Sequence, residues 1–416
     1  MQNELKPKKN DKMKTNLIIA ALALCFAGTA AAQTTDTPAG EGEGYVFTDT
    51  KVVPITPVKN QHRSGTCWCF STISFLEGEI LRTGAEAPHL SEMWVVRNAY
   101  KDKARKYVRM HGHINWAQGG AACDVTEGIK AHGIVPFEVY PGLNYGTDKP
   151  DFHELAEVLK SYLDTVIEVA DRTSKPLSTA WERGFDAILD EYFGVMPETF
   201  TYNGKEYTPQ SFAASLPIDI NDYVSVGSYT HHPFHTQFIL EVPDNWMWGT
   251  VYNVTLDEMM AIVDNALANN YPIEWATDVS EKGFSRTKAI GIVPDEDIDG
   301  LDGSEAEKWG DLTDAEKEAA LYKFDRPVKE KIITQEMRQT AFDNYETTDD
   351  HGMVIVGTAH DQAGNPFFKV LNSWDVLPPY AGYYYFSRPF VAYKTTSIIV
   401  NKNAIPKDIR NKLHLK

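Results

Sequence analysis

A few residues far apart in the sequence have side chains that could together break an amide bond. Cys67 follows a Ser-Gly-Thr turn and opens an apolar-periodic segment that ends near Gly84, so we expect it on the first turn of a buried helix. There the helix dipole and the free backbone N–H groups favour the thiolate, the form of cysteine that attacks a carbonyl. Gln61, six residues earlier, could donate to the oxyanion that this attack forms.

Candidate partners of Cys67 lie near the end of the chain. His351 opens one apolar run, and Asn372 closes a second apolar run that begins at Phe367. Turn-forming residues at 361–366 separate the two runs, so the pattern predicts a hairpin. The hairpin would bring His351 and Asn372 to the same level. Asn372 could then accept a hydrogen bond from one imidazole nitrogen and leave the other facing the sulfur.

These segments resemble the active-site segments of the papain-like cysteine peptidases. In that superfamily a Gln, a Ser-Gly pair and Cys-Trp open the central helix, and Asn-Ser-Trp follows the strand of the His. The resemblance implies that Cys67, His351 and Asn372 are catalytic. It also implies that Gln61 binds the oxyanion and that Trp374 shields the His–Asn hydrogen bond from water. The implied fold is α+β, with a helical lobe, a β lobe and substrate in the cleft between them; no cofactor and no metal are implied.

Further motifs extend the resemblance along the chain. The pair Gly119-Gly120 precedes a predicted helix near 124–132, as in the superfamily, where such glycines let the substrate backbone lie close. The resemblance therefore implies that Gly119 and Gly120 bind substrate. The runs at 202–209 and 252–258 resemble the bleomycin hydrolase, or aminopeptidase C, branch. Asp375 stands where the superfamily commonly has a Gly after Asn-Ser-Trp.

That branch implies a peptide substrate and an aminopeptidase. Its members carry a C-terminal arm whose carboxylate pairs with the substrate α-amine, and they often assemble into hexamers. Here the pattern of residues 404–416 predicts one short basic helix. At ~3.3 Å per residue an extended tail of this length could reach the cleft, but a helical one would be too short. An aminopeptidase is favoured. A papain-like endopeptidase with an open cleft and a catalytically inactive papain-like binding protein remain alternatives.

The N-terminal segment predicts export. Lys14 precedes an apolar run from Leu17 to Phe26, and Ala30-Ala31-Ala32 offers a small-residue cleavage site. Residues 1–32 therefore read as a secretory signal peptide, too short to span a bilayer. We expect a secreted or periplasmic protein that leaves the membrane after cleavage following Ala32.

The rest of the chain is expected to form one peptidase domain. Its 43% hydrophobic content is enough for a sizeable core. The predicted parts are a flexible tail at 33–50, a peptidase domain at 51–403 and a short C-terminal tail at 404–416. Within the domain we expect a helical lobe at about 60–145, a long helical insertion at about 150–345 and a β lobe at about 346–403.

Composition excludes several classes of function. The formal net charge of −18, from 58 acidic and 40 basic residues, argues against nucleic acid and anionic membranes as partners. After cleavage Cys67, Cys69 and Cys123 remain, so an odd count leaves at least one free thiol. No second Cys/His pair with zinc spacing accompanies Cys67 and Cys69, and we interpret Cys69 as a packed helix residue.

Two segments resemble metal sites but lack essential parts. The acidic loop at 295–307 matches the start of a calcium-binding EF-hand, yet Ala306 stands where the bidentate Glu belongs. The run His231-His232-Pro233-Phe234-His235 contains a proline that prevents a two-His helical face. We interpret the first segment as a solvated loop and expect no zinc at the second.

Overall fold

The computed structural model describes residues 44–173, 176–296 and 313–416. The helices are α1 (Cys67–Arg82), α2 (Glu92–Arg109), α3 (Ala122–His132), α4 (His153–Thr173), α5 (Ala180–Phe193), α6 (Pro209–Ala213), α7 (Leu256–Ala268), α9 (Asp314–Leu321), α10 (Gln335–Asp343), α11 (Arg388–Lys394) and α12 (Lys407–Lys412). The strands are β1 (Phe47–Val52), β2 (Phe200–Tyr202), β3 (Lys205–Tyr207), β4 (Tyr223–Gly227), β5 (Gln237–Ile239), β6 (Thr250–Asn253), β7 (Ile273–Thr277), β8 (Phe284–Ser285), β9 (Ile290–Gly291), β10 (His351–Asp361), β11 (Pro366–Leu371), β12 (Tyr383–Ser387) and β13 (Thr395–Asn401). Two short 3₁₀ turns lie at Ile220–Asp222 and Lys402–Ala404.

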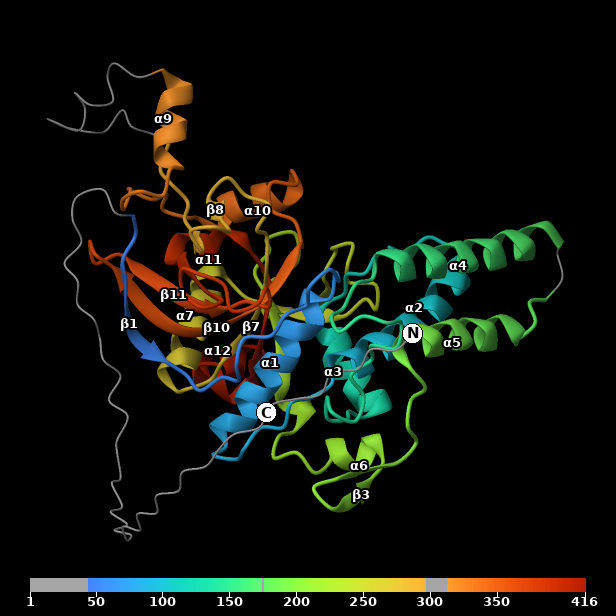
Figure 1. The fold of residues 1–416 in the computed structure, drawn as a ribbon. Coiled ribbons are helices and arrows are strands. Elements are labelled where there is room, and N and C mark those ends of the chain that lie inside the picture. Colours follow the sequence, from blue (N-terminus) through green and yellow to red (C-terminus); the bar gives the residue numbers. More distant parts are fainter. Residues whose placement is uncertain (1–43, 174–175, 297–312) are drawn as a thin grey trace, which may run out of the picture. The chain divides into compact units, whose positions relative to one another are not determined.

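Helix α1 is buried on all sides. It contacts strands β7 and β10 and also helices α2 and α3, and Figure 1 shows it between the sheet and the other helices. Ile73, Leu76 and Ile80 are fully buried, as their helical spacing predicts. The helix ends at Arg82, and Gly84 follows in the left-handed region with φ of 85°. The predicted helix beginning at Cys67 is confirmed.

One large mixed sheet lies against α1. Within the described residues its order is β5-β6-β4-β13-β7-β10-β11-β12-β9-β8, and β1 pairs separately with β10. Strands β10 and β11 form the predicted antiparallel hairpin, with Val354 opposite Leu371. On the other edge of β10, His351 lies opposite Thr277 of β7. The first residue of β10 is therefore fixed by β7 beside it and by α1 above it.

The long helical insertion expected at about 150–345 is only partly helical, and this prediction is corrected. Helices α4 and α5 form as expected, but β4, β6 and β7 from the same region join the main sheet. Strand β7 lies between β10 and β13, at the centre of the sheet, and is buried along almost its whole length. The β lobe therefore draws its strands from the middle of the chain as well as from its end.

The predicted end of the flexible tail at residue 50 is too late, because Phe47–Val52 forms strand β1. β1 pairs with the far half of β10, from Phe47 opposite Asp361 to Val52 opposite Gly357. The Phe47 ring stacks on Tyr385 with a centroid distance of 4.1 Å. Aromatic burial and strand pairing order this segment despite the glycines that precede it.

The C-terminal tail forms the short helix α12, as predicted. Ile409 and Leu413 are buried in the main core, and Lys412 pairs with Glu258 of α7 at 2.7 Å. In the described parts of the chain no helix is long and apolar enough to cross a membrane. Most of the acidic loop at 295–307 lies outside the described residues.

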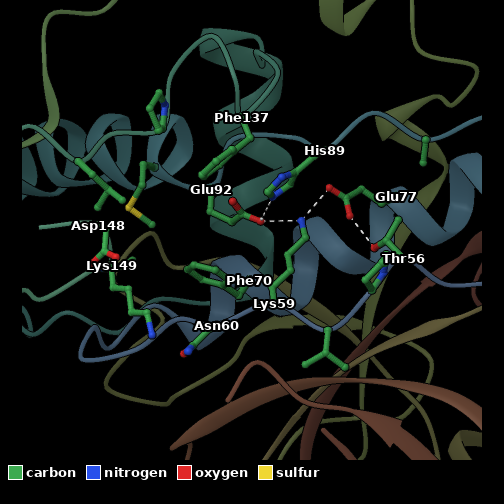
Figure 2. Close-up of a pocket in the computed structure, with 17 residues that line it drawn as sticks. Thr56, Lys59, Asn60, Phe70, Glu77, His89, Glu92, Phe137, Asp148 and Lys149 are labelled. Atoms are coloured by element: carbon green, nitrogen blue, oxygen red, sulfur yellow. Dashed lines mark hydrogen bonds and ion pairs between the residues drawn. The ribbon is translucent and has the colours of Figure 1, made fainter. Parts of the chain in front are cut away.

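A pocket of about 490 Å³ lies beside a buried ion network, apart from Cys67 (Figure 2). Lys59 Nζ lies 2.7 Å from Glu77 and 2.6 Å from Glu92, and all three side chains are at least nine-tenths buried. Burial alone would lower the pKa of Lys59, but the two carboxylates raise it. Glu77 also accepts from the backbone N–H of Leu90. The network therefore connects the segment before α1, which contains Lys59, to α1 and to the start of α2.

Replacing Lys59 should therefore destabilise the fold strongly. Lys59→Met would leave two buried carboxylates without their cation, and we expect a loss of about 3–5 kcal/mol in the free energy of unfolding, measured by urea denaturation. Lys160→Met is the matched control, since Lys160 pairs with Asp164 at the exposed surface. Its expected cost is at most ~1 kcal/mol. Equal losses for the two variants would contradict a structural role for the network.

Candidate active site

Cys67 is the first residue of α1 and faces the start of β10. Its sulfur interacts with the backbone N–H groups of Gly352 and Trp68. A side chain at Gly352 would collide with Ser71, since its Cβ atom would lie 2.7 Å from Ser71 Oγ. The missing side chain lets β10 approach α1 closely, which places His351 and Cys67 on the walls of one pocket.

His351 is held by Asn372, which directly follows β11, the second strand of the hairpin. Its Nε2 lies 2.8 Å from Asn372 Oδ1, so the other ring nitrogen is left for the pocket. The ring stacks on Trp374 with centroids 4.4 Å apart, and both His351 and Asn372 are buried. Asn372 Oδ1 also accepts from the backbone N–H of Ser373 at 2.7 Å, which fixes the amide orientation. The structure thus brings together the residues that the hairpin pattern paired.

Gln61 is hydrogen-bonded to Ser373, the residue after Asn372. Its backbone N–H donates to the Ser373 carbonyl at 2.9 Å, and its side-chain Oε1 accepts from Ser373 Oγ at 2.6 Å. These contacts point Nε2 away from Ser373. One of its N–H groups donates to the Ser64 carbonyl at 2.8 Å. An amide nitrogen has a second N–H, which is the donor that an oxyanion would use.

Burial and hydrogen bonds act in opposite directions on the protonation of Cys67 and His351. Burial raises the pKa of the Cys67 thiol to about 12, although the N–H groups of Gly352 and Trp68 oppose this shift. Burial also lowers the pKa of His351 to about 4, against the hydrogen bond with Asn372. Among the described residues no hydrogen bond joins Cys67 to His351. Both shifts come from desolvation, which disfavours the charged forms, and the hydrogen bonds to the sulfur and to the imidazole favour those forms.

Asp375 has a backbone that explains the glycine usual at this position. Its φ is 76°, in the left-handed region that glycine adopts freely and other residues adopt at a cost. The Asp375 carboxylate offsets part of this cost, since it accepts from Asn60 Nδ2 and from the Val376 N–H, both at 2.8 Å. The turn after Trp374 is therefore kept despite the substitution.

The pocket that contains Cys67 and His351 is small and acidic. Its volume is about 50 Å³, and the carboxylates of Asp244, Glu274, Asp349 and Asp350 line it together with Gly120 and Trp68. Burial raises the pKa of Glu274 to about 8 and that of Asp349 to about 7; the nearby Asp244 adds to the shift of Asp349.

The segment 240–249, which we call the cleft loop, was missed by the sequence analysis. Asp244 Oδ1 accepts from Asn115 Nδ2 at 2.8 Å on the helical side. The Asp244 N–H donates to Asp349 Oδ2 at 3.2 Å on the sheet side. The loop thus joins both walls of the pocket. Its turn residues Pro243-Asp244-Asn245 were a signal for a turn, but not for its place beside Cys67.

The cleft loop also changes the surroundings of the glycine pair. A side chain at Gly119 would collide with the Asp244 carboxylate, so this glycine is needed for the loop to pack. Gly120 lines the pocket itself, beside Trp68. Of the two predicted substrate-binding glycines, only Gly120 therefore faces the pocket.

Two groups of side chains have metal-like proximity. His231, His232 and Glu241 lie together, and both imidazoles already contact Glu241, at 2.7 and 3.2 Å. Glu77, His89 and Glu92 form the second group, where the Lys59 ammonium lies between the two carboxylates (Figure 2). Since their ligand atoms are paired, neither group requires an ion.

Comparisons with known proteins agree with this geometry. Residues 47–153 match the family described as papain family cysteine protease, and residues 301–416 match the Peptidase C1-like family. The chain is 20% identical to aminopeptidase C of Lactobacillus helveticus over 394 residues, which cover 84% of this chain and 80% of the relative. It is 22% identical over 418 residues to the mitochondrial cysteine proteinase 1 of Saccharomyces cerevisiae, with 89% and 80% covered.

The fold also has a solved counterpart. A crystal structure of PepW from Lactobacillus rhamnosis superposes with a TM-score of 0.66 at 18% sequence identity, and the match covers 88% of this chain and 84% of that one. The α+β papain-like fold expected from the sequence is confirmed. The chain is a cysteine-type peptidase with a papain-family segment at 47–153 and a C1-like segment at 301–416, and aminopeptidase C is among its relatives.

Proposed function

We propose that this cysteine peptidase is an aminopeptidase that removes one residue at a time from the N-terminus of peptides. The observation that carries the proposal is the cleft loop, which joins Asn115 and Asp349 across the pocket and lies against Gly119. In the superfamily that this chain resembles, the substrate backbone on the N-terminal side of the cut lies along the glycine pair. A loop in that place leaves room for one residue before the cut.

The proposed mechanism uses Cys67 as the nucleophile and His351 as its base. As Cys67 Sγ attacks the peptide carbonyl, its proton passes to the ring nitrogen of His351 that faces the pocket. Gln61 Nε2 and a backbone N–H near Cys67 hold the oxyanion, and Asn372 keeps the imidazole oriented. His351 then gives the proton to the leaving amine. In the second half, water attacks the thioester, and the acid and the free thiol are released.

The surroundings of His351 support this scheme. The lowered pKa of His351 leaves its imidazole able to accept the thiol proton when the attack occurs. Trp374 covers the His351 ring, and this contact supports the shielding role that the resemblance implies.

The C-terminal arm of the branch is not the group that closes the cleft here. Helix α12 packs into the main core, and no residue of 404–416 lines the pocket of Cys67. An endopeptidase with an open cleft is the second candidate, because residues 404–416 do not line the pocket, but the cleft loop favours the aminopeptidase. A homo-oligomer, hexameric by family resemblance, is part of the proposal, as is export through residues 1–32.

Paired peptides test the proposed specificity. We expect the mature protein in reducing buffer to cleave a fluorogenic peptide with a free N-terminus and to leave its N-acetylated copy uncut. The acetyl group removes the charge and adds atoms where the cleft loop lies. Cys67→Ala is the control for contaminating peptidases. Cleavage of both peptides at similar kcat/KM would establish an endopeptidase, and full activity of Cys67→Ala would exclude the proposed nucleophile.

Alkylation tests the protonation state of Cys67. The raised thiol pKa means that the thiolate fraction grows about tenfold for each pH unit below that pKa. We therefore expect iodoacetamide to label Cys67 slowly near pH 6 and progressively faster up to about pH 9, as measured by peptide mass. Cys67→Ala separates this signal from Cys69 and Cys123. Rapid labelling that is flat from about pH 5 would instead indicate a thiolate–imidazolium pair.

Export is tested on the full chain. Expressed in a Gram-negative host, it should reach the periplasm with Gln33 as its first residue, because a small residue at Ala32 suits signal cleavage. Ala32→Arg should slow this processing and leave the precursor. N-terminal sequencing of the fractionated protein measures both. Recovery of uncut full-length protein in the cytoplasm would contradict the proposed export.

A further inference from the structure

The pocket beside Cys67 has an unbalanced charge. Four carboxylates line it, and no lysine or arginine is among the described residues that do so. One of the four is already engaged, since Asp350 accepts from the backbone N–H groups of Val279 and Ser280 at 2.8 and 3.0 Å. The other three are Asp244, Glu274 and Asp349. A catalytic pocket that only had to accept apolar side chains would not need them.

Glu274 is the most unusual of these residues. It lies on the central strand β7 and is only 1% exposed. Its Oε1 accepts from Ser71 Oγ at 2.9 Å, but its Oε2 has no hydrogen-bond partner in the described structure. A buried carboxyl oxygen without a partner is costly whether the group is charged or protonated. Either form would be relieved by a hydrogen-bond donor that enters the pocket.

Asp244 and Asp349 add charge at the mouth of the same pocket. The Asp244 carboxylate is held by Asn115 through Oδ1, and Asp349 receives the Asp244 N–H through Oδ2. Asp349 also interacts with its own backbone N–H, and the Lys103 cation acts on Asp244 from outside the pocket lining. The two side chains come from opposite walls, so a cation between them would be attracted by both.

The size of the pocket limits the donor. A volume of about 50 Å³ accommodates a few water-sized groups, and the cleft loop closes the space beyond it. An ammonium group fits this room, whereas a second substrate residue does not. A peptide has such a group on its first residue, joined through a single Cα atom to the carbonyl that Cys67 attacks.

We propose that Glu274, with Asp244 and Asp349, forms the receptor for the α-ammonium group of the substrate's first residue. The inference rests on the proposed aminopeptidase function and names the groups that would enforce it. Glu274 supplies the unpartnered buried oxygen, and the two aspartates supply charge from the cleft loop and from the strand of His351. An internal loop and a sheet residue would thereby do what a C-terminal carboxylate does in the branch that this chain resembles, whereas α12 packs in the main core.

Glu274→Gln tests the proposal with little change of shape. The amide can still accept from Ser71, but it lacks the charge that pairs with an ammonium group. For a peptide with a free N-terminus we expect kcat/KM to fall about 10- to 100-fold, mainly through KM. Glu330→Gln is the matched control, because Glu330 is half-buried and also accepts from a serine, Ser387, but lies outside this pocket. It should retain wild-type kinetics.

Asp244→Asn is a second variant that does not touch the sheet. Its Oδ1 can still accept from Asn115, so the cleft loop should keep its place, and KM should again rise for the free-amine peptide. Thermal melting and iodoacetamide labelling of Cys67 verify that each variant is folded. Wild-type kcat/KM in both folded variants would overturn the proposal.

The outcomes also separate the proposal from the function on which it rests. If the wild type cleaves only free-amine peptides and both variants match it, the aminopeptidase stands and the receptor is wrong. If the wild type cleaves acetylated peptides equally well, the aminopeptidase itself fails. The last comparison uses an acetylated peptide with a lysine one position before the residue whose carbonyl is attacked. Cleavage of it that depends on Glu274 would assign the carboxylates to a basic side chain and overturn the α-amine assignment.

Discussion

The close contact between the first turn of α1 and the first residues of β10 is the constraint on which the site depends. Gly352 has no side chain, so Ser71 and the Cys67 carbonyl can lie against the strand. Because α1 and β10 lie so close, Cys67 and His351 line the same pocket and the Gly352 N–H reaches the Cys67 sulfur. The surrounding elements maintain this contact: β7 holds β10 in register, and the Lys59 network fixes α1 from its other end.

The parts of the site that could be predicted from the sequence are those set by local patterns. A turn before an apolar-periodic helix placed Cys67, and two apolar runs about a polar turn paired His351 with Asn372. Strand β1 was missed because its order comes from pairing with β10, far along the chain, and not from its own composition. Strands β4 and β6 were missed for the same reason, since they are short and depend on their neighbours.

The acidic pocket was beyond reach for a different reason. Glu274 interrupts an apolar strand and looks like a solvent-facing residue of an alternating pattern, yet α1 packs on that face and its Ser71 contacts the carboxyl group. Asp244 lies in a loop whose partners, Asn115 and Asp349, are more than a hundred residues away on either side. The thiolate at Cys67 stays a prediction: a helix N-terminus is visible in a sequence, but the burial that opposes its effect on the thiol pKa is not.

The carboxylates and the thiol are coupled through their charges. Burial is the main reason that the pKa of Cys67 is high, and Asp244 and Asp350 raise it further because they disfavour a second negative charge nearby. A substrate ammonium group between the carboxylates would offset that charge at the moment when a peptide carbonyl is in place. The pKa of the thiol would then fall only with a substrate bound. Recognition of the free N-terminus and activation of the nucleophile would thus be one electrostatic event, and an acetylated peptide would lose both.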